Sequence, residues 1–316
     1  MRCLVFGPAA ELEAELAGVP AQSVEVVDAP VWISNSEEPG AAVRAKRDAS
    51  IVRAAAAVAE GRADALVTPG STGAALAAGL LTVRRMPGVH RPGLAVLLPV
   101  PGRPVLLLDV GATVEVRPEQ LVQFAFMGAA FMQGVMGVAR PRVGLLSIGE
   151  EPEKGTPQVI DAHARLRALE APFEFTGNVE GGDVTGGTAD VVVTDGFTGN
   201  VAIKLMEGTT RTLVDSIRTA IRSGTVSKAG GLLIRGRLAE LRARLDPEAV
   251  AGAYLLGLRG LVVVCHGASS RRAIANAVAL ADRAVTQDVV GRTGAALEAA
   301  GVGRAASVPA DTLGAR

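Results

Sequence analysis

A repeating unit constrains this sequence more than any other feature. Short runs of valine and leucine are each followed by a glycine-containing loop and then by an alanine-rich segment of helical length. Five such runs lie at Ala65–Thr68, Val105–Leu108, 143–147, Val191–Val193 and 261–265. Continuous apolar strands are typical of parallel sheets, because helices cover both faces of such a sheet. We therefore expect an α/β fold, a three-layer sandwich with a mostly parallel, doubly wound sheet.

The composition agrees with a single α/β domain over residues 1–316 and excludes several classes of function. The 316 residues are 49% hydrophobic and 20% charged, which is enough apolar material for a large core. The 32 basic and 32 acidic residues cancel and aromatic residues make up only 3%, so we expect no nucleic-acid binding. Two cysteines and three scattered histidines suit neither a disulfide framework nor a metal site, and no apolar run approaches the ~20 residues needed to cross a bilayer. We expect a cytoplasmic protein without a bound cofactor.

A helical excursion is expected over residues 206–247, where the strand pattern stops. The sequence there reads as a helix, a loop SGTVSKAGGLLIRG and a second helix RLAELRARL, which would form a hairpin projecting from the sheet. Leu232, Leu233 and Ile234 are candidates for contact with a membrane surface or a partner. Packing in a dimer interface or in the core explains them at least as well. Residues 301–316 are aperiodic and rich in small residues, and we expect a mobile tail.

The most informative single motif is VVVTDGFTGNVAIK, residues 191–204, in which a buried strand leads into a glycine loop and a helix. Glycines let the backbone approach a ligand closely, and the first N–H groups of a helix attract anions. Asp195, Asn200 and Lys204, with Gly196 and Gly199, therefore predict a site for phosphate or a phosphorylated molecule, with an acid–base group beside it. The simpler interpretation makes the aspartate a helix cap, the asparagine a turn residue and the lysine a solvated surface charge.

Three further loops follow predicted strands and offer polar groups to the same ligand. They contain Gly149, Glu150, Glu151, Lys154 and Gly155 in the first, Ser71, Thr72 and Gly73 in the second, and His266, Gly267 and Ser269 in the third. Because ligands of open α/β sheets bind at the carboxyl ends of the strands, we expect these loops to converge on one cleft. Internal ion pairs in an exposed turn explain the first loop almost as well, and ordinary turn chemistry explains the second. Cys265 is expected to pack in the core and not to act as a nucleophile.

Common nucleotide and nucleophile motifs are missing from the sequence. It contains no G-x-x-x-x-G-K-[ST] phosphate loop, no well-placed G-x-G-x-x-G and no G-x-S-x-G. The predicted site therefore handles an anion without the usual nucleotide signatures.

Several long motifs, in order from about residue 29 to about residue 284, resemble the phosphate acyltransferase of bacterial phospholipid synthesis, the PlsX family. They are GRADALVTPGSTGAALA, VLLLDVGATVEVRPEQLVQFAFMG, PRVGLLSIGEEPEKG, FTGNVEGGDV, ADVVVTDGFTGNVAIKLMEG and LLGLRGLVVVCHGASS. The resemblance implies a fold related to phosphotransacetylases and isopropylmalate dehydrogenases, and a homodimer. It also implies transfer of an acyl group from acyl carrier protein to inorganic phosphate, giving an acyl phosphate for lipid synthesis.

The resemblance implies two sets of site residues. The catalytic set is Asp195, Asn200, Lys204, His266 and Lys154. The substrate set is Ser71, Thr72, Gly73, Asp109, Gly111, Gly149, Glu150, Glu151, Gly155, Asn178, Glu180, Gly196, Gly199, Gly267 and Ser269. Lys204 or Lys154 would hold phosphate, Asp195 would orient groups or accept a proton, and His266 would stabilise the oxyanion. Because phosphate itself attacks the thioester carbonyl, this chemistry needs no protein nucleophile.

The chain also departs from the family pattern. Members open with a strand and an Asp-Ala-Met-Gly-Gly-Asp loop, whereas this sequence begins near what resembles their second strand, so we expect an N-terminally shortened, divergent member. Ser71 and Thr113 stand where asparagine is usual, and SNSEEP replaces a Met-Asp form before a basic run. Arg44, Lys46 and Arg47 of that run would dock the acidic carrier protein.

Other functions stay open at this point. The first is a phosphotransacetylase-like enzyme that uses acyl-CoA. The second is a catalytically impaired paralogue that binds acyl carrier protein or a membrane acyltransferase, which the missing first loop motivates. A dicarboxylate dehydrogenase shares the fold class, but the sequence lacks the metal-binding carboxylate cluster and the nucleotide motif of such an enzyme.

Overall fold

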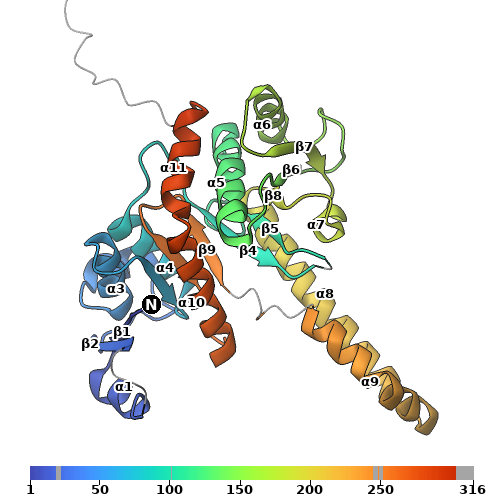
Figure 1. Ribbon diagram of the computed structural model, residues 1–316, viewed down its shortest axis with the longest axis horizontal. Helices are drawn as coiled ribbons and strands as arrows, with labels where there is room; N and C mark the ends of the chain where they lie inside the picture. Colours follow the sequence, from blue (N-terminus) through green and yellow to red (C-terminus); the bar gives the residue numbers. More distant parts are fainter. Residues whose placement is uncertain (19–22, 101, 245–247, 249–251, 304–316) are drawn as a thin grey trace, which may run out of the picture.

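The computed structural model describes residues 1–18, 23–100, 102–244, 248 and 252–303. One eight-stranded sheet, in the order β3-β10-β9-β4-β5-β8-β6-β7, forms its centre (Figure 1). The strands are β3 Ala65–Thr68, β4 Gly93–Leu98, β5 Val105–Leu108, β6 Arg142–Leu146, β7 Glu174–Val179, β8 Val191–Val193, β9 Ala253–Leu256 and β10 Leu261–Val264. All five runs predicted from the sequence are strands of this sheet, and β4, β7 and β9 complete it.

Strand direction divides the sheet into two parallel groups. β3 pairs in parallel with β10 at one edge, and β5, β8, β6 and β7 pair in parallel at the other. Between these groups, β9 and β4 pair antiparallel with each other and with their outer neighbours. The sheet is mostly parallel, as predicted, but the central reversal was not anticipated. It places the carboxyl ends of the two parallel groups at opposite ends of the sheet.

Alternate side chains of each strand enter two separate apolar cores, one on each face of the sheet. In β5, Leu106 and Leu108 lie in the first core, while Val105 and Leu107 lie in the second. All four side chains are at most 1% exposed. This alternation is expected for a strand that is apolar on both faces, because successive side chains point to opposite sides.

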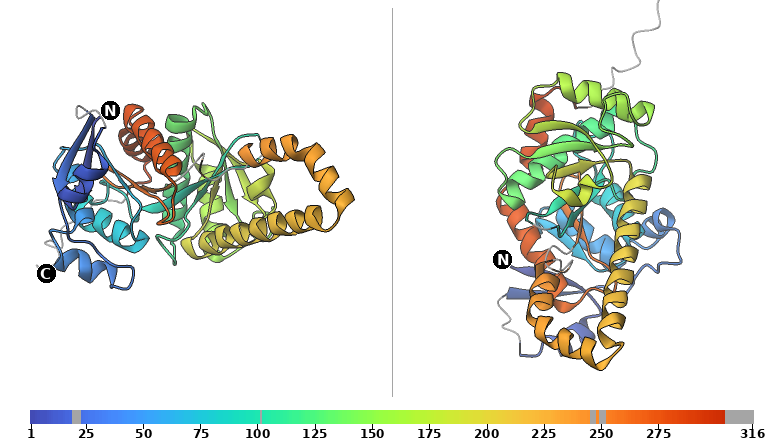
Figure 2. Two further views of the ribbon diagram at one scale, coloured as in Figure 1. Left: turned by 90° about the horizontal axis from the view of Figure 1, so that it is seen from below. Right: turned by 90° about the vertical axis from the view of Figure 1, so that its right-hand side faces the viewer.

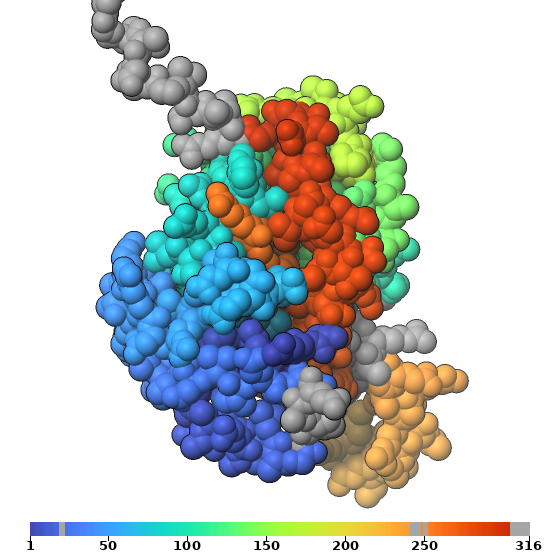
Figure 3. Space-filling view, turned by 60° about the vertical axis from the view of Figure 1, so that its left-hand side comes forward, coloured from blue at the N-terminus to red at the C-terminus, as the bar shows by residue number. Residues whose placement is uncertain are grey.

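Helices cover both faces, which gives the predicted three layers. The first core is closed by α5 (Pro118–Met136), α6 (Pro157–Ala168), α10 (Arg271–Thr286) and α11 (Val289–Ala299). The second core is closed by α2 (Pro39–Ala45), α3 (Ser50–Ala59), α4 (Thr72–Ala78), α7 (Asp183–Gly186) and the first turns of α8 (Gly196–Arg222). Figure 3 shows α10 and α11, in red, as a continuous ridge on one side of the molecule.

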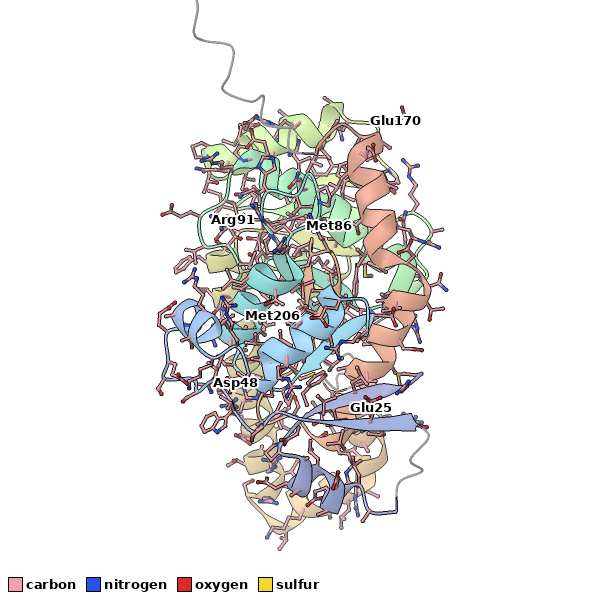
Figure 4. All side chains as sticks on the ribbon, turned by 90° about the vertical axis from the view of Figure 1, so that its left-hand side faces the viewer. Glu25, Asp48, Met86, Arg91, Glu170 and Met206 are labelled. Carbon is pink, nitrogen blue, oxygen red and sulfur yellow. The ribbon has the colours of Figure 1, made fainter. Side chains whose placement is uncertain are left out.

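A small second sheet lies at the N-terminal end of the chain. β1 (Cys3–Gly7) and β2 (Val24–Asp28) pair in parallel, and α1 (Ala9–Glu15) contacts both strands. Helix α3 contacts β1 and so connects this sheet to the main body. In Figure 4, Glu25 of β2 is labelled and marks this sheet below the larger one.

Helices α8 and α9 (Thr225–Arg244) form a long pair that extends away from the sheet (Figures 1 and 2). They pack closely, because a Cβ on Gly231 would lie 2.4 Å from Cγ2 of Ile221. The predicted loop SGTVSKAGGLLIRG is wrong from Thr225 onward, where the chain is helical; only Ser223 and Gly224 form the turn. Gly230, Gly231 and Gly236 indicated a loop, but packing of one helix on the other overrides their weak helix propensity.

Parts of two sequence predictions lie outside the described residues, namely 245–247 of the excursion and 304–316 of the tail. Among the residues that the structure describes, no helix is both long enough and apolar enough to cross a membrane.

Candidate functional site

The carboxyl end of β5 is organised by one buried aspartate, Asp109. Its Oδ1 accepts hydrogen bonds from the N–H groups of Leu94 at 2.9 Å, Gly111 at 3.1 Å and Ala112 at 3.0 Å. Its Oδ2 accepts from the N–H of Thr113 at 2.7 Å. Burial raises the pKa of this carboxyl, which has no exposed surface, and the four N–H donors oppose that rise. Asp109 therefore holds a loop in shape from inside the protein.

The start of α8 rests directly on this loop. The N–H of Gly196 donates to the carbonyl of Thr113 at 2.8 Å. A Cβ on Gly199 would lie 1.9 Å from the carbonyl oxygen of Asp109, so only glycine permits this approach. The glycines of the DGFTGN motif thus form a junction between two segments that are far apart in the sequence.

Asp195 and Asn200 both have structural partners at this junction. Asp195 is the N-cap of α8, where its Oδ1 accepts from the N–H of Thr198 at 2.8 Å. Asn200 donates from Nδ2 to the carbonyl of Val110 at 3.0 Å. The cap made by Asp195 matches the simpler interpretation of the motif, whereas Asn200 lies inside α8 and not in a turn. The cap leaves one carboxylate oxygen of Asp195 available at the junction.

The first turn of α8 offers few donors to an anion. The N–H groups of Gly196, Thr198 and Gly199 already have protein acceptors. Within the described part of the chain, the Phe197 N–H is the one first-turn donor without an acceptor. The start of α8 therefore has the positive end of a helix dipole but few free N–H groups to bind an anion.

The charged loop after β6 is held from beneath by Asn178 of β7. Asn178 donates from Nδ2 to the carbonyl of Glu151 at 2.8 Å, and its Oδ1 accepts from Nδ1 of His163 at 3.0 Å. The hydroxyl of Ser147 donates to the carbonyl of Lys154 at 2.9 Å. Asn178 and His163 are 5% and 7% exposed, so this support is buried.

The charged side chains of this loop lie in solvent. Glu150, Glu151 and Lys154 are all exposed. Gly155 has a φ of 112°, which favours glycine, and a Cβ on Gly149 would lie 3.0 Å from Cγ of Lys154. None of the ion pairs of the described residues involves this loop, so internal ion pairs do not explain its charge density.

The loops after β3 and β10 lie side by side at the other end of the sheet. The N–H of Cys265 donates to the carbonyl of Thr68 at 2.8 Å. A Cβ on Gly267 would lie 3.6 Å from the carbonyl oxygen of Pro69. His266 is exposed, and its Nδ1 accepts from a backbone N–H two residues later at 3.1 Å, so the proton of a neutral ring lies on Nε2.

The start of α4 has open N–H groups, in contrast to the start of α8. Ser71 is the N-cap, and its Oγ accepts from the N–H of Ala74 at 3.4 Å. The N–H groups of Thr72 and Gly73 have no acceptor among the described residues. Two adjacent backbone donors at the positive end of a helix suit one oxyanion.

The predicted site residues thus fall into two groups, and they do not meet at the carboxyl ends of one set of parallel strands as expected. The group after β5, β8, β6 and β7 is Asp109, Gly111, Asp195, Gly196, Gly199, Asn200, Lys204, Gly149, Glu150, Glu151, Lys154, Gly155, Asn178 and Glu180. The group after β3 and β10 is Ser71, Thr72, Gly73, His266, Gly267 and Ser269. The reversal of strand direction at β9 and β4 separates them.

Helix α8 starts at the first group and packs on the sheet only through its first turns. Its Ile203 and Met206 pack against the same core as Ala74 of α4, so both helices cover one face. Lys204 is exposed and lies about 13.5 Å along the helix from Asp195, at 1.5 Å per residue. It therefore lies more than two helical turns beyond the junction with the Asp109 loop.

The basic run lies at the end of α2, close to the second group. Arg44 and Arg47 are exposed, and Lys46 is half-buried. The start of α2 packs against the start of α4, because a Cβ on Gly73 would lie 2.7 Å from Cγ of Pro39. One short helix therefore separates the basic run from the open N–H groups of α4.

Both cysteines are free, and Cys265 lies in the first core at 2% exposure. Burial raises the pKa of the Cys265 thiol, which is the opposite of the shift that activates a nucleophile. In the described residues, no group of three or more histidine, cysteine, aspartate or glutamate side chains is arranged to hold a metal ion.

His163 and Thr113 are parts of the site that sequence reasoning missed. His163 had no partner suggested by its spacing, and Thr113 was noted only as a departure from a family pattern. One signal for His163 was its place on α6, the helix directly before β7. The chain reverses between these two elements, and this brings Asn178 of β7 beside His163.

Comparison with known proteins places this chain in a family. Residues 1–292 match the family described as "Fatty acid synthesis protein". The phosphate acyltransferase of Heliobacterium modesticaldum is 46% identical over 267 residues, which cover 84% of this chain and 79% of that protein. The phosphate acyltransferase of Moorella thermoacetica is 42% identical over 288 residues, covering 91% and 84%. Among solved structures, a phosphotransacetylase from Staphylococcus aureus shares the fold, with a TM-score of 0.57 at 15% identity over 90% of this chain and 86% of that one.

Proposed function

We propose, because this chain belongs to the phosphate acyltransferase family of fatty acid synthesis proteins, that it transfers an acyl group from acyl carrier protein to inorganic phosphate. The observation that carries the proposal is the pair of open N–H groups at the start of α4, with His266 on the neighbouring loop and a basic run one short helix away. These features supply a place for an oxyanion and a surface for an acidic carrier.

The reaction needs no nucleophile from the protein. A phosphate oxygen attacks the thioester carbonyl, the new C–O bond gives the acyl phosphate, and the C–S bond breaks. The proton of hydrogen phosphate is transferred to the carrier thiol. Because a thiol of pKa about 8.5 leaves readily, positioning and oxyanion donors supply most of the rate. The buried, inactive state of Cys265 supports a mechanism without an acyl-enzyme.

We place the reacting phosphate between the start of α4 and the exposed face of α8. The N–H groups of Thr72 and Gly73 would bind its oxygens, and Lys204 would contribute positive charge. His266 would donate from Nε2 to the developing oxyanion of the thioester carbonyl. We choose Lys204 over Lys154 as the phosphate ligand, because α8 packs on the same core as α4, whereas Lys154 lies on the exposed loop after β6.

The junction of Asp109, Asp195 and Asn200 has a positioning role in this proposal. It fixes the angle at which α8 leaves the sheet and so sets where Lys204 lies. The loop of Glu150 and Lys154 would orient the substrate from the far side. Its buried support by Asn178 keeps that loop in one shape.

The exposed Arg44 and Arg47 are our candidate carrier-docking residues, with Lys46 beside them in an ion pair to Glu37 at 2.7 Å. Charge complementarity mainly raises the rate of encounter with an acidic partner. Replacing Arg44 and Arg47 by glutamate should therefore lower kcat/KM for the acyl carrier protein substrate by at least tenfold, with little change for acyl-CoA. Equal losses with both substrates would remove the docking assignment.

We also propose that the chain works as a homodimer and touches the membrane surface through the far half of the hairpin. Leu232, Leu233 and Ile234 on α9 are 70%, 88% and 48% exposed, which is unusual for three consecutive large apolar residues. An amphiphilic product gives a reason for such contact. The two free thiols support the reducing cytoplasm as the compartment.

Turnover of acyl carrier protein thioester with and without phosphate tests the proposed function. We expect acyl phosphate and free carrier to appear together, only when phosphate is added. Lys204→Gln should raise the KM for phosphate at least tenfold, while Lys228→Gln, an exposed lysine on α9, serves as the matched control. Thioester binding without turnover would instead identify a carrier-binding paralogue, and turnover of acyl-CoA alone would identify a phosphotransacetylase-like enzyme.

A further inference from the structure

Two adjoining cavities lie where the π-helix η2 (Gly79–Val83) ends, away from the residues discussed above. Each has a volume of about 300 Å³. The first is lined by Val58, Ala59, Thr82, Val83, Arg84 and Arg259. The second shares Val58 and Arg259 with the first and extends to Asp64 and Asp288. They lie by the first residues of β3 and β10, at the end of these strands opposite to Ser71 and His266.

The backbone of Arg84 is strained. Its φ of 70° and ψ of 159° fall in a region that is essentially restricted to glycine. The surroundings hold this conformation, because the Arg84 N–H donates to the carbonyl of Gly79 at 2.8 Å and its carbonyl accepts from the N–H of Arg259 at 2.9 Å. Asp288, the other non-glycine residue with positive φ in the described chain, lines the second cavity. Strain of this kind gathers at functional sites.

Arg84 and Arg259 both line the first cavity, and its lining contains no acidic side chain. Arg259 is oriented by a hydrogen bond from its Nε to the carbonyl of Arg85 at 3.2 Å, which leaves its terminal nitrogens available. The guanidinium of Arg84 has no hydrogen-bond or ion-pair partner among the described residues. A pair of planar, five-donor groups at one cavity suits bidentate binding of a phosphate or carboxylate.

We propose that Arg84 and Arg259 form a second anion site, which binds a small organic molecule through its phosphate or carboxylate group. The apolar walls at Val58 and Val83 would contact the body of that molecule. In this proposal, the strained backbone of Arg84 places its side chain beside the cavity that Arg259 also lines. The site is independent of the proposed transfer reaction, because none of its residues belongs to either group described above.

Isothermal titration with inorganic phosphate, and separately with malonate, tests this proposal on the full chain. We compare the wild type with Arg84→Gly and with Arg140→Gln, an exposed arginine remote in sequence from both cavities. Wild type should show an Arg84-dependent class of binding for phosphate, malonate or both. Arg84→Gly should weaken that class at least tenfold, and Arg140→Gln should leave it unchanged. The melting temperature of Arg84→Gly should equal or exceed that of the wild type, because glycine removes the strain.

The two probes separate the chemical sources of the anion. Loss of the phosphate class alone would identify a phosphate ester as the ligand, and loss of the malonate class alone would identify a carboxylate. Identical isotherms for wild type and Arg84→Gly with both probes would overturn the proposal. Phosphate bound at the transfer site would remain in Arg84→Gly, so failure of this inference and failure of the proposed function give different results.

Discussion

At the scale of single residues, the start of α8 depends on a glycine that no other residue can replace. We predict that Gly199→Ala destabilises the protein by about 3 kcal/mol, because its Cβ would lie 1.9 Å from the carbonyl oxygen of Asp109. Gly208→Ala in the same helix has nothing within 4 Å of the new Cβ and should stabilise by up to about 1 kcal/mol. Urea denaturation of both variants measures the difference. Equal stabilities would show that α8 does not rest on the Asp109 loop.

Asp109 itself gives a graded prediction. Asp109→Asn can keep the acceptor at Oδ1 for Leu94, Gly111 and Ala112 but turns an amide toward the N–H of Thr113, so we expect a loss of about 1–3 kcal/mol. Asp109→Ala removes all four acceptor contacts and should cost clearly more. Chemical denaturation again provides the measurement. An alanine variant as stable as the asparagine variant would contradict the assignment of Asp109 as the organiser of this loop.

Sequence patterns identified the right residues here but not their partners. The motif at 191–204 was correctly read as a strand followed by a helix, and the cap made by Asp195 matches the simpler of its two interpretations. Gly196, Gly199 and Asn200, however, lie in α8 itself and not in a loop or turn. The acceptors for Gly196 and Asn200 lie in the 109–113 segment, and no local pattern announces contacts across that distance. The N–H groups of Thr72 and Gly73 are open because no described residue accepts a hydrogen bond from them, and the sequence does not show which acceptors lie near a group.

At the scale of elements, the connection of β6 to β8 depends on a partly buried ion pair. Nη2 of Arg142 donates to Oδ1 of Asp190 at 3.0 Å, and its backbone N–H donates to Oδ2 at 2.8 Å. Burial alone would raise the pKa of Asp190, but the hydrogen bonds from Arg142 lower it below its ordinary value. A carboxyl with a lowered folded-state pKa stabilises the fold above its unfolded pKa of about 3.9, and that contribution is lost as the pH falls through the folded value.

Asp190→Asn should therefore be less stable than the wild type by about 2 kcal/mol at pH 7. The gap should narrow as the pH falls below about 4, because the wild-type carboxyl then becomes protonated. Urea denaturation at pH 7 and at several values below pH 4 gives the comparison. A gap that stays constant over this range would show that ionisation of Asp190 does not contribute.

The hairpin offers two apolar surfaces with different proposed partners. Leu213 and Ile217 on α8 are 57% and 51% exposed and lie one helical turn apart, so a second copy of the chain is the occupant we expect there. Leu213→Asp combined with Ile217→Asp should convert the proposed dimer to a monomer in sedimentation velocity. Leu232→Asp combined with Leu233→Asp should leave the dimer intact and abolish sedimentation with anionic liposomes. Unchanged behaviour of either pair would remove the partner assigned to it.

Elements with strong periodic signals were predicted well. The five valine- and leucine-rich runs are strands, whereas β4, β7 and β9 were not predicted. No crossover helix of the repeating unit directly follows β4 or β9. The antiparallel pairing of β4 and β9 makes the strands on one side of the sheet run opposite to those on the other side. A single apolar run in the sequence does not show which strand it pairs with. The predicted loop in the hairpin failed because its glycines look locally like a turn, whereas Gly231 lies at the contact between α8 and α9.

At the scale of the whole molecule, the central reversal of the sheet decides which predicted residues can act together. Residues after β3 and β10 lie at one end, and residues after β5, β8, β6 and β7 lie at the other. The family resemblance supplied the reaction, and the packing of α8 and α4 on one core favours Lys204 over Lys154 as the proposed phosphate ligand. The proposed reaction is direct attack by phosphate on the thioester, without an acyl-enzyme.

Mass spectrometry of the intact protein, incubated with acyl carrier protein thioester, tests that claim most directly. Without phosphate, we expect the protein mass to stay unchanged and the thioester to persist. With [18O]phosphate, we expect acyl phosphate that retains the labelled oxygens, again with no change in protein mass. An acyl adduct on the protein in the absence of phosphate, chased to product when phosphate is added, would contradict direct attack and require a nucleophile that the described structure does not present.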